Sequence, residues 1–299
     1  MATLYTQHDS NIRKTWLLMT VFLGMIIGLG FLFSQVYGSP NILYIAVALS
    51  IGMNIVAYWK SDSIALAMSG AKPIARAGNE YVYRMVENLC ITAGLSMPRL
   101  YVIQSAQINA FATGRNPEHA AIAITTGAIE KLQNEELEGV LAHELSHIGN
   151  RDILISSVAV VLSGLIAILA DWFLRISFWG GRDNDNNRSG AILMAIGLVA
   201  AILAPIAASL IQFAVSRKRE FLADASGALL TRYPEGLANA LEKISHDSAQ
   251  LPHAHNATAH LFISNPFKGK QGQSWFTKLF MTHPPLEERI RILRGMEIK

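Results

Sequence analysis

Two histidines and a glutamate within five consecutive residues have the types and spacing of a zinc-hydrolase centre: His143-Glu144-Leu145-Ser146-His147. On an α-helix, residues four apart lie on one face, so both imidazoles can bind one zinc ion. Glu144 follows the first ligand and can contact a metal-bound water, whose pKa zinc lowers to about 7. Such a glutamate takes the proton of the attacking water and then delivers a proton to the leaving amine. This motif therefore predicts hydrolysis at a carbonyl, with Glu144 as general base.

A catalytic zinc ion needs a third protein ligand and one open position. The extended metzincin pattern is excluded, because Asn150 and Ile153 stand where it needs glycine and histidine. The best candidate is Glu220, in the run Arg219-Glu220-Phe221-Leu222-Ala223-Asp224. Asp224 follows one helical turn later and could accept a hydrogen bond from a ligand imidazole. The alternative is a solvated helix that happens to carry two acidic residues.

The composition of the chain indicates a membrane protein. Of its 299 residues, 51% are hydrophobic and 16% are charged, whereas a soluble domain carries about 25% charged residues. Four uncharged runs are long enough for the roughly 20 residues that cross a bilayer: 15–36, 41–59, 153–170 and 190–216. The alternative for each run is a buried core helix. The first run is too long for a signal peptide and lacks a convincing cleavage site, so we expect a retained anchor.

The chain divides into alternating membrane and soluble parts. We expect membrane hairpins at 1–60 and 153–216, and soluble segments at 61–152 and 217–299. Helical periodicity and caps predict helices at 80–93, from an Asn134 cap to about Gly149, and at 217–230, 234–246 and 287–295. Short apolar runs predict strands at 100–104 and 121–125, and residues 250–280 read as irregular. The fold class is thus an α+β membrane protein with four hydrophobic helices.

The second hairpin also explains how two distant motifs could meet. The helix that carries His143 and His147 ends just before the third apolar run, and Glu220 begins just after the fourth. If these runs form a hairpin, both of its ends return to one membrane face. Two motifs about 70 residues apart then become neighbours at the membrane surface.

Basic residues predict the side of the membrane on which that surface lies. They flank the first run on its N-terminal side, follow the second run and follow the fourth: Arg13, Lys14, Lys60, Lys72, Arg76, Arg217, Lys218 and Arg219. The positive-inside rule then places both termini and residues 60–152 in the cytoplasm, although Arg182 and Arg188 in the opposite loop weigh against it. No basic stretch with interleaved aromatics predicts nucleic-acid binding, and the sequence carries no signal for an oligomeric state.

These motifs together resemble the HtpX-type branch of the membrane-bound M48 metalloproteases, relatives of the prenyl-protein peptidase Ste24 and of the mitochondrial protease Oma1. The resemblance covers nearly the whole chain. It comprises two N-terminal membrane helices, Asn109-Ala110-Phe111-Ala112-Thr113-Gly114, the motif at 143–147, the second hairpin, the run at 219–224, and Thr282-His283-Pro284-Pro285 with Arg289 beyond.

The resemblance implies a fold, a cofactor and a set of site residues. The fold is a gluzincin-like protease domain of helices and a small β-sheet. One Zn²⁺ per chain would be bound by His143, His147 and Glu220, with Glu144 as general base. His283 and Arg289 would lie near the site, where a donor could stabilise an oxyanion. The substrate would pair as an added strand with the cleft edge, formed by Asn109, Ala110, Phe111 and Ala112.

The implied function is proteolysis of unfolded or misfolded membrane proteins, in quality control at a bacterial inner membrane. Two other functions remain open on the sequence. A narrower peptidase could trim prenylated C-termini, but Ste24 relatives do so in a larger chamber of many helices, and four spans are few for that. A membrane chaperone could use a structural zinc, but structural sites close all four positions and need no base such as Glu144.

Overall fold

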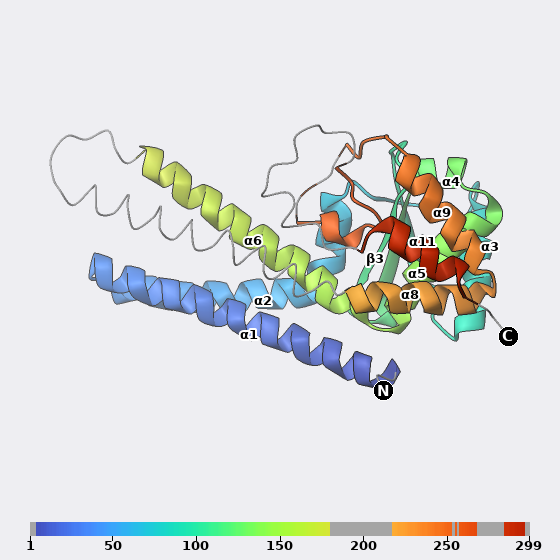
Figure 1. Ribbon diagram of the computed structural model, residues 1–299. Coiled ribbons are helices and arrows are strands. Elements are labelled where there is room, and N and C mark those ends of the chain that lie inside the picture. Colours follow the sequence, from blue (N-terminus) through green and yellow to red (C-terminus); the bar gives the residue numbers. More distant parts are fainter. Residues whose placement is uncertain (1–3, 180–216, 253–254, 256, 268–283, 297–299) are drawn as a thin grey trace.

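The computed structural model describes residues 4–179, 217–252, 255, 257–267 and 284–296. Three long helices, α1 (Leu4–Tyr37), α2 (Pro40–Met68) and α6 (Asp152–Trp179), extend together to one side of a compact part that holds all the strands (Figure 1). Their apolar stretches 9–35, 40–68 and 152–169 are long enough to cross a bilayer. The described residues thus hold three candidate membrane helices, and the predicted fourth run, 190–216, lies outside them.

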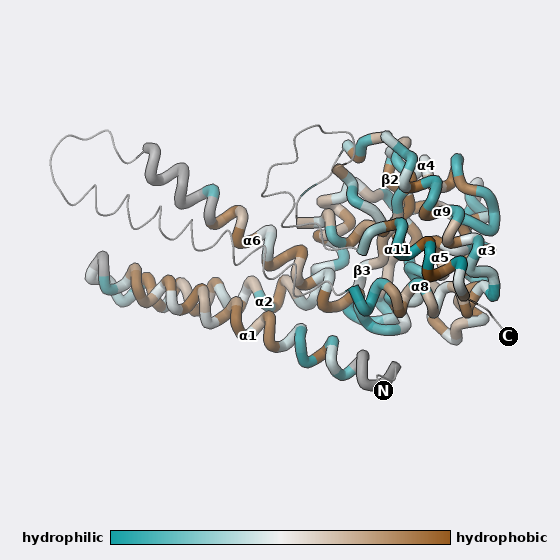
Figure 2. The backbone as a smooth tube through the Cα atoms, viewed as in Figure 1, coloured by the Kyte–Doolittle hydropathy of each residue, from teal (hydrophilic) through white to brown (hydrophobic). Residues whose placement is uncertain are grey.

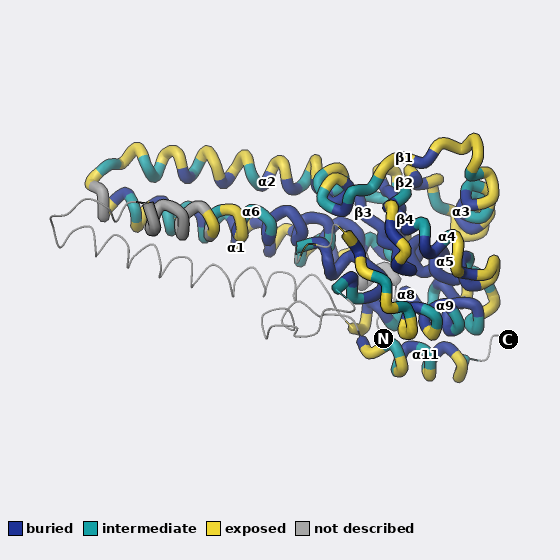
Figure 3. Tube along the Cα trace, turned by 90° about the horizontal axis from the view of Figure 1, so that it is seen from above, coloured by how far each residue is buried: buried dark blue, intermediate teal, exposed yellow. Residues whose placement is uncertain are grey.

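Apolar side chains cover the outer faces of α1 and α2. Hydrophobic residues recur along the three long helices, and hydrophilic residues are more frequent in the compact part (Figure 2). One whole side of α2 is exposed (Figure 3). Large exposed side chains on these two helices include Trp16, Leu17, Phe31, Leu32, Tyr44, Ile45, Leu49, Ile55 and Trp59. An apolar surface of this extent is expected in contact with lipid rather than water.

The compact part is built on a small mixed sheet. Its strands are β1 (Lys72–Pro73), β2 (Arg99–Ile103), β3 (Ala110–Gly114) and β4 (Ala120–Thr125), and their order across the sheet is β1-β2-β4-β3. β2 and β4 are parallel, and the other two pairs are antiparallel. Every residue of β3 and β4 is buried, because both faces of the sheet are covered.

Two helical layers cover the sheet. On one face Ala110, Ala112, Ile122 and Ile124 join the core formed with α3 (Glu80–Ala93), α5 (Asn134–Gly149) and α9 (Pro234–His246). On the other face Phe111, Ala121 and Ala123 pack with Ala65 and Leu66 of α2 and Val160 of α6. The membrane helices therefore continue directly into the core beside the edge strand β3.

Most predicted elements are confirmed within a residue or two. Helices α3, α5 and α9, the strands β2 and β4, and the helices α8 (Arg217–Thr231) and α11 (Leu286–Arg294) lie where periodicity placed them. The cap of α5 is corrected by one residue: Gln133, not Asn134, is the N-cap, in a capping box with Glu136. Three short elements complete the described fold: the 3-10 turn η1 (Pro117–His119), α4 (Thr126–Lys131) and the 3-10 turn η3 (Ala259–Leu261).

Candidate metal centre

The structure brings three candidate metal ligands together from two helices. His143 and His147 of α5 and Glu220 of α8 each offer one ligand atom, and these atoms lie within 4.8 Å of one another. Close packing of α8 on α5 makes this possible. Gly227 lies against α5 so tightly that a Cβ at that position would be 3.0 Å from the His143 backbone nitrogen. A larger residue at 227 would therefore push the two ligand-bearing helices apart.

The two imidazole rings are oriented so that their Nε2 atoms lie next to each other. Nδ1 of His143 lies 3.0 Å from Oδ1 of Asp224, and Nδ1 of His147 lies 3.1 Å from Oδ2 of Asp152. A carboxylate at Nδ1 favours the proton on that nitrogen and leaves a lone pair on Nε2. The two Nε2 atoms are 3.2 Å apart. Two unprotonated nitrogens this close repel each other, and a cation bound by both removes that repulsion.

This donor set fits zinc. Tetrahedral coordination with Zn–N bonds of about 2.0–2.1 Å separates two ligand nitrogens by roughly 3.3 Å, close to the observed distance between the rings. Glu220 Oε1 lies 3.6 Å from Nε2 of His147, and its Oε2 lies 3.9 Å from Nε2 of His143. Two imidazoles and one carboxylate are a common ligand set of catalytic zinc sites, which keep a fourth position for water or substrate.

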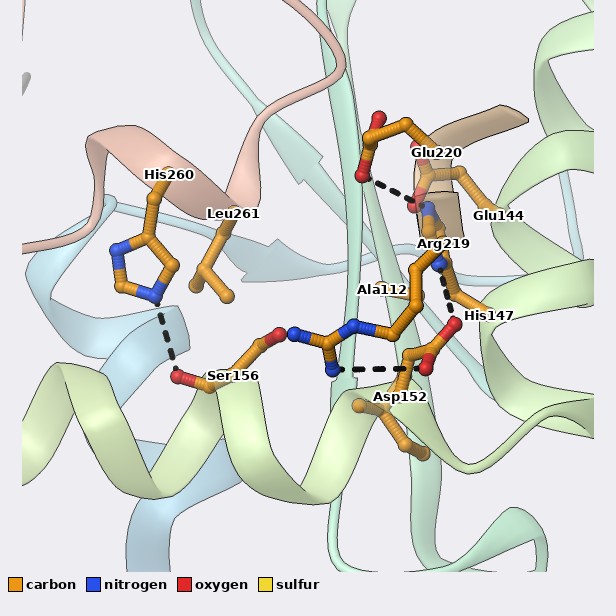
Figure 4. A pocket seen from close by; sticks show the side chains of 10 residues that line it. Ala112, Glu144, His147, Asp152, Ser156, Arg219, Glu220, His260 and Leu261 are labelled. Atoms are coloured by element: carbon orange, nitrogen blue, oxygen red, sulfur yellow. Dashed lines mark hydrogen bonds and ion pairs between the residues drawn. The ribbon is translucent and has the colours of Figure 1, made fainter. Parts of the chain in front are cut away.

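Glu144 is buried next to these ligands, and it lines a cavity of about 30 Å³ together with His147 and Glu220 (Figure 4). Burial raises the pKa of the Glu144 carboxyl, and Glu220 adds to the rise. The two histidines and a hydrogen bond from the Ala112 backbone amide act in the opposite direction. That amide also fixes the carboxylate beside the metal position, where a general base has to lie.

Arg289 and Asp224 form a buried ion pair behind His143. The Nε and Nη2 atoms of Arg289 donate to the two carboxylate oxygens of Asp224 at 2.8 and 2.6 Å. Burial alone would raise the pKa of the Asp224 carboxyl, but Arg289 and His143 lower it to about 2. Arg289 Nη1 lies 3.8 Å from Glu220 Oε2. Arg289 thus lies at the site, as the resemblance implied, whereas His283 lies outside the described residues.

Replacing Asp224 by asparagine should weaken zinc binding without removing a ligand. The variant loses the anionic partner of the His143 Nδ1–H, and such outer partners contribute about 10- to 100-fold in metal affinity. Competition against a chromophoric chelator measures this change, and thermal unfolding measured in parallel separates lost affinity from a lost fold. The control is Asp247→Asn, a partly buried aspartate that binds Lys131 rather than a candidate ligand. Equal zinc affinity of Asp224→Asn and wild type would contradict the role given to Asp224.

Three residues at the site were not found from the sequence. Asp152, the first residue of α6, contacts His147 and accepts a hydrogen bond of 2.6 Å from Nδ2 of Asn11 in α1. Arg219 Nη1 lies 3.6 Å from Asp152 Oδ1 and donates to Asn11 Oδ1 at 3.5 Å. Asp152 follows its histidine by five residues, beyond the end of α5, so helical spacing does not relate the two. Asn11 precedes the first apolar run, where polar residues are common, so its position in the sequence carries no signal.

The segment implied as the substrate edge is the outer strand of the sheet, and its outward groups are largely engaged. In the antiparallel register with β4, the backbones of Ala110 and Ala112 face away from the sheet. The Ala110 carbonyl accepts from the Ile263 amide at 3.0 Å, and the Ala112 amide bonds Glu144. The side chain of Asn109 is buried and donates to the Ser264 carbonyl at 3.1 Å. Phe111 stacks edge-on against Phe262 on the opposite face, with ring centroids 5.0 Å apart.

Comparisons with known proteins identify relatives of this chain. A family model described as Peptidase family M48 matches residues 76–297. Three proteins named "Protease HtpX homolog" align over nearly their whole lengths. The one from Syntrophobacter fumaroxidans is 47% identical, covering 95% of this chain and 98% of its own. The one from Caldanaerobacter subterraneus is 44% identical, covering 99% of each chain, and the one from Pyrococcus furiosus is 44% identical, covering 96% of each. A crystal structure of S. mikatae Ste24p gives a TM-score of 0.49 at 18% identity, over 97% of this chain and 67% of that one.

Proposed function

This chain belongs to peptidase family M48, in its HtpX branch, and is a membrane metalloprotease; on that premise we propose that it is a zinc endopeptidase of unfolded or misfolded membrane proteins. His143, His147 and Glu220 bind one zinc ion, and Glu144 is the general base. The observation that carries the proposal is the pair of Nε2 atoms 3.2 Å apart, with a buried carboxylate oxygen 3.0 or 3.1 Å from the Nδ1 atom of each ring.

Each side chain of the site has a separate role in the proposed reaction. Zinc, when bound, supplies Lewis acidity that polarises a carbonyl and lowers the pKa of water. Glu144 takes a proton from the attacking water at its carboxylate and delivers it to the leaving amine. Asp224 and Asp152 hold the imidazoles in one tautomer and orientation. His283 and Arg289 are assigned by resemblance to stabilising the developing oxyanion, a contribution that is typically about 10²–10³ in rate. In the structure Arg289 bonds Asp224 and the Ile263 carbonyl, so we propose that Arg289 acts by holding Asp224 and that His283 is the oxyanion donor.

The position of the site relative to the long helices supports a membrane substrate. Asn11 of α1 and Asp152 of α6 both contact the site, so it lies where two apolar helices enter the compact part. Following the positive-inside rule, we propose a plasma membrane of bacterial inner-membrane type, with both termini and the site in the cytoplasm. Digestion of a tag after Lys299 by protease added outside intact spheroplasts would contradict that orientation.

We propose that the polypeptide substrate pairs with β3 as an added strand. Ala110 and Ala112 have outward backbone groups, but Ile263 occupies the Ala110 carbonyl and Glu144 the Ala112 amide. A bound peptide therefore displaces Ile263 or pairs with the Ala112 carbonyl. Strand pairing has a period of two residues. Methylating peptide nitrogens one at a time should therefore raise KM by about 5- to 10-fold at alternate positions only. An effect without that alternation would contradict strand pairing.

Purified protein in detergent tests the proposed function as a whole. We expect it to cleave an unfolded membrane protein internally, to stop when a zinc chelator is added, and to recover when zinc is restored, because the attack needs zinc-bound water. The folded form of the same protein should be cut far more slowly. Cleavage confined to a prenylated C-terminal peptide would contradict the broad endopeptidase. Persistent zinc-independent binding without cleavage would point instead to a chaperone.

A further inference from the structure

Arg219 presents an unused pair of hydrogen-bond donors at the catalytic cavity. Its side chain is 4% exposed and lines the cavity with Glu144, Glu220 and Leu261. Its Nη1 is turned to Asp152 and Asn11. Its Nε and Nη2 atoms are buried, and neither has a hydrogen-bond partner within the part of the chain that the structure describes. Figure 4 shows this opposite edge of the guanidinium facing the space between Leu261 and Glu220.

Arg289, the other buried arginine of the site, shows that the Nε–Nη2 edge of a guanidinium can bind oxygen atoms here. Arg289 uses the same two atoms, Nε and Nη2, to bind both oxygens of Asp224 at 2.8 and 2.6 Å. In Arg219 the equivalent edge has no such partner, and its contact with Asp152 on the other side is long, at 3.6 Å. Neutralising Asp152 therefore does not account for the placement of this guanidinium. Buried donors without partners are costly and rare, so an oxygen acceptor is expected at this position during function.

We propose that Arg219 binds a main-chain carbonyl oxygen of the polypeptide substrate in the cavity that Ala112 of β3 also lines. This inference rests on the proposed endopeptidase function and names one of its substrate contacts. A single carbonyl oxygen can accept both N–H groups of the edge. The cavity of about 30 Å³ has room for water but not for a substrate residue. Substrate entry therefore requires this cavity to widen.

The buried charges of the site favour a carbonyl over a carboxylate. One zinc ion and two arginines together balance the negative charges of four acidic residues. A further buried anion would therefore be unpaired. The charged residues counted are Arg219, Arg289, Glu144, Asp152, Glu220 and Asp224, and all are buried. Lys14 of α1 lies near Arg219 but is only partly buried, so water screens its charge. A neutral carbonyl satisfies the donors without disturbing the balance.

Peptide binding to the Glu144→Gln protein tests the inference without relying on turnover. The probe is a fluorescein-labelled decapeptide that the wild-type protein cleaves, and anisotropy gives its Kd. Arg219→Met should raise the Kd by about 10- to 100-fold, the contribution of a charge-assisted hydrogen bond, with zinc content unchanged. Arg219→Lys should recover part of the affinity. The matched control is Arg217→Met, an exposed arginine of the same helix, which should leave the Kd unchanged.

Replacing the peptide's carbonyl oxygens with sulfur, one at a time, identifies the contact. Sulfur is a weaker hydrogen-bond acceptor than oxygen. The replacement at one peptide position should therefore lower the affinity for the protein that has Arg219 and leave the affinity for Arg219→Met unchanged. If Arg219→Met loses zinc, the same sulfur effects are compared between Arg219→Lys and the protein with Arg219. Identical sulfur effects in both proteins, or dependence on an acidic side chain of the peptide, would overturn the assignment. Failure of the zinc-loaded wild-type protein to cleave any peptide would instead overturn the proposed function, a separate result.

Discussion

Replacing Glu144 by glutamine should leave zinc bound and lower kcat by about 10²–10⁴-fold, the usual contribution of a general base. Glutamine keeps the size of the side chain and can still accept the Ala112 amide hydrogen bond, but it cannot take a proton from water. The loss should appear in kcat rather than KM, because the carboxylate acts on the attacking water and not on the bound peptide. Metal analysis and single-turnover cleavage of one peptide measure both properties.

The matched control for this variant is Glu138→Gln, which makes the same change on α5 at a partly exposed position away from the cavity. It should have wild-type activity. Two outcomes would contradict the role of Glu144. Loss of zinc from Glu144→Gln would make Glu144 a ligand, and retained turnover would remove it from the reaction.

Replacing Glu220 by alanine should remove zinc at chelator concentrations that wild type withstands. The variant loses one of three protein ligands, so its affinity should fall by more than the roughly 10- to 100-fold that a lost outer partner costs. It also leaves Arg289 Nη1 without the carboxylate oxygen that lies 3.8 Å from it. Turnover should disappear in step with the metal. Zinc content measured after dialysis against a graded chelator series provides the comparison.

The control is Glu287→Ala, which removes an exposed acidic residue of α11. This variant protein should keep its zinc. Excess zinc should restore part of the activity of Glu220→Ala if the helices still bring His143 and His147 together. A full zinc complement in Glu220→Ala under the same dialysis would eliminate Glu220 as the third ligand.

The local parts of the site could be predicted because they depend on spacing within one helix. His143, Glu144 and His147 share one face of α5 as a consequence of helical geometry. Glu220 required a longer argument, that the two ends of a membrane hairpin return to one surface, and its proximity to the histidines is confirmed. The second limb of that hairpin lies outside the described residues, so the route by which the chain returns stays a prediction.

Contacts between distant segments could not be predicted in the same way. Asn11 bonds Asp152 across 141 positions, and Ile263 pairs with the Ala110 carbonyl. No periodicity relates such residues, because packing of whole elements brings them together. Arg219 illustrates the difficulty in a single residue. In the sequence it is one of three consecutive basic residues at a membrane flank, which indicates an orientation signal, whereas in the fold it is buried at the cavity.

The central claim is that one zinc ion binds to His143, His147 and Glu220 together, and anomalous scattering at the zinc absorption edge from crystals of the detergent-solubilised protein tests it most directly. We expect one strong peak about 2.0–2.2 Å from Nε2 of each histidine and from a Glu220 oxygen, with Glu144 adjacent but not coordinated. A peak elsewhere in the chain, or a peak at the histidines with the Glu220 carboxylate turned away from it, would contradict the account.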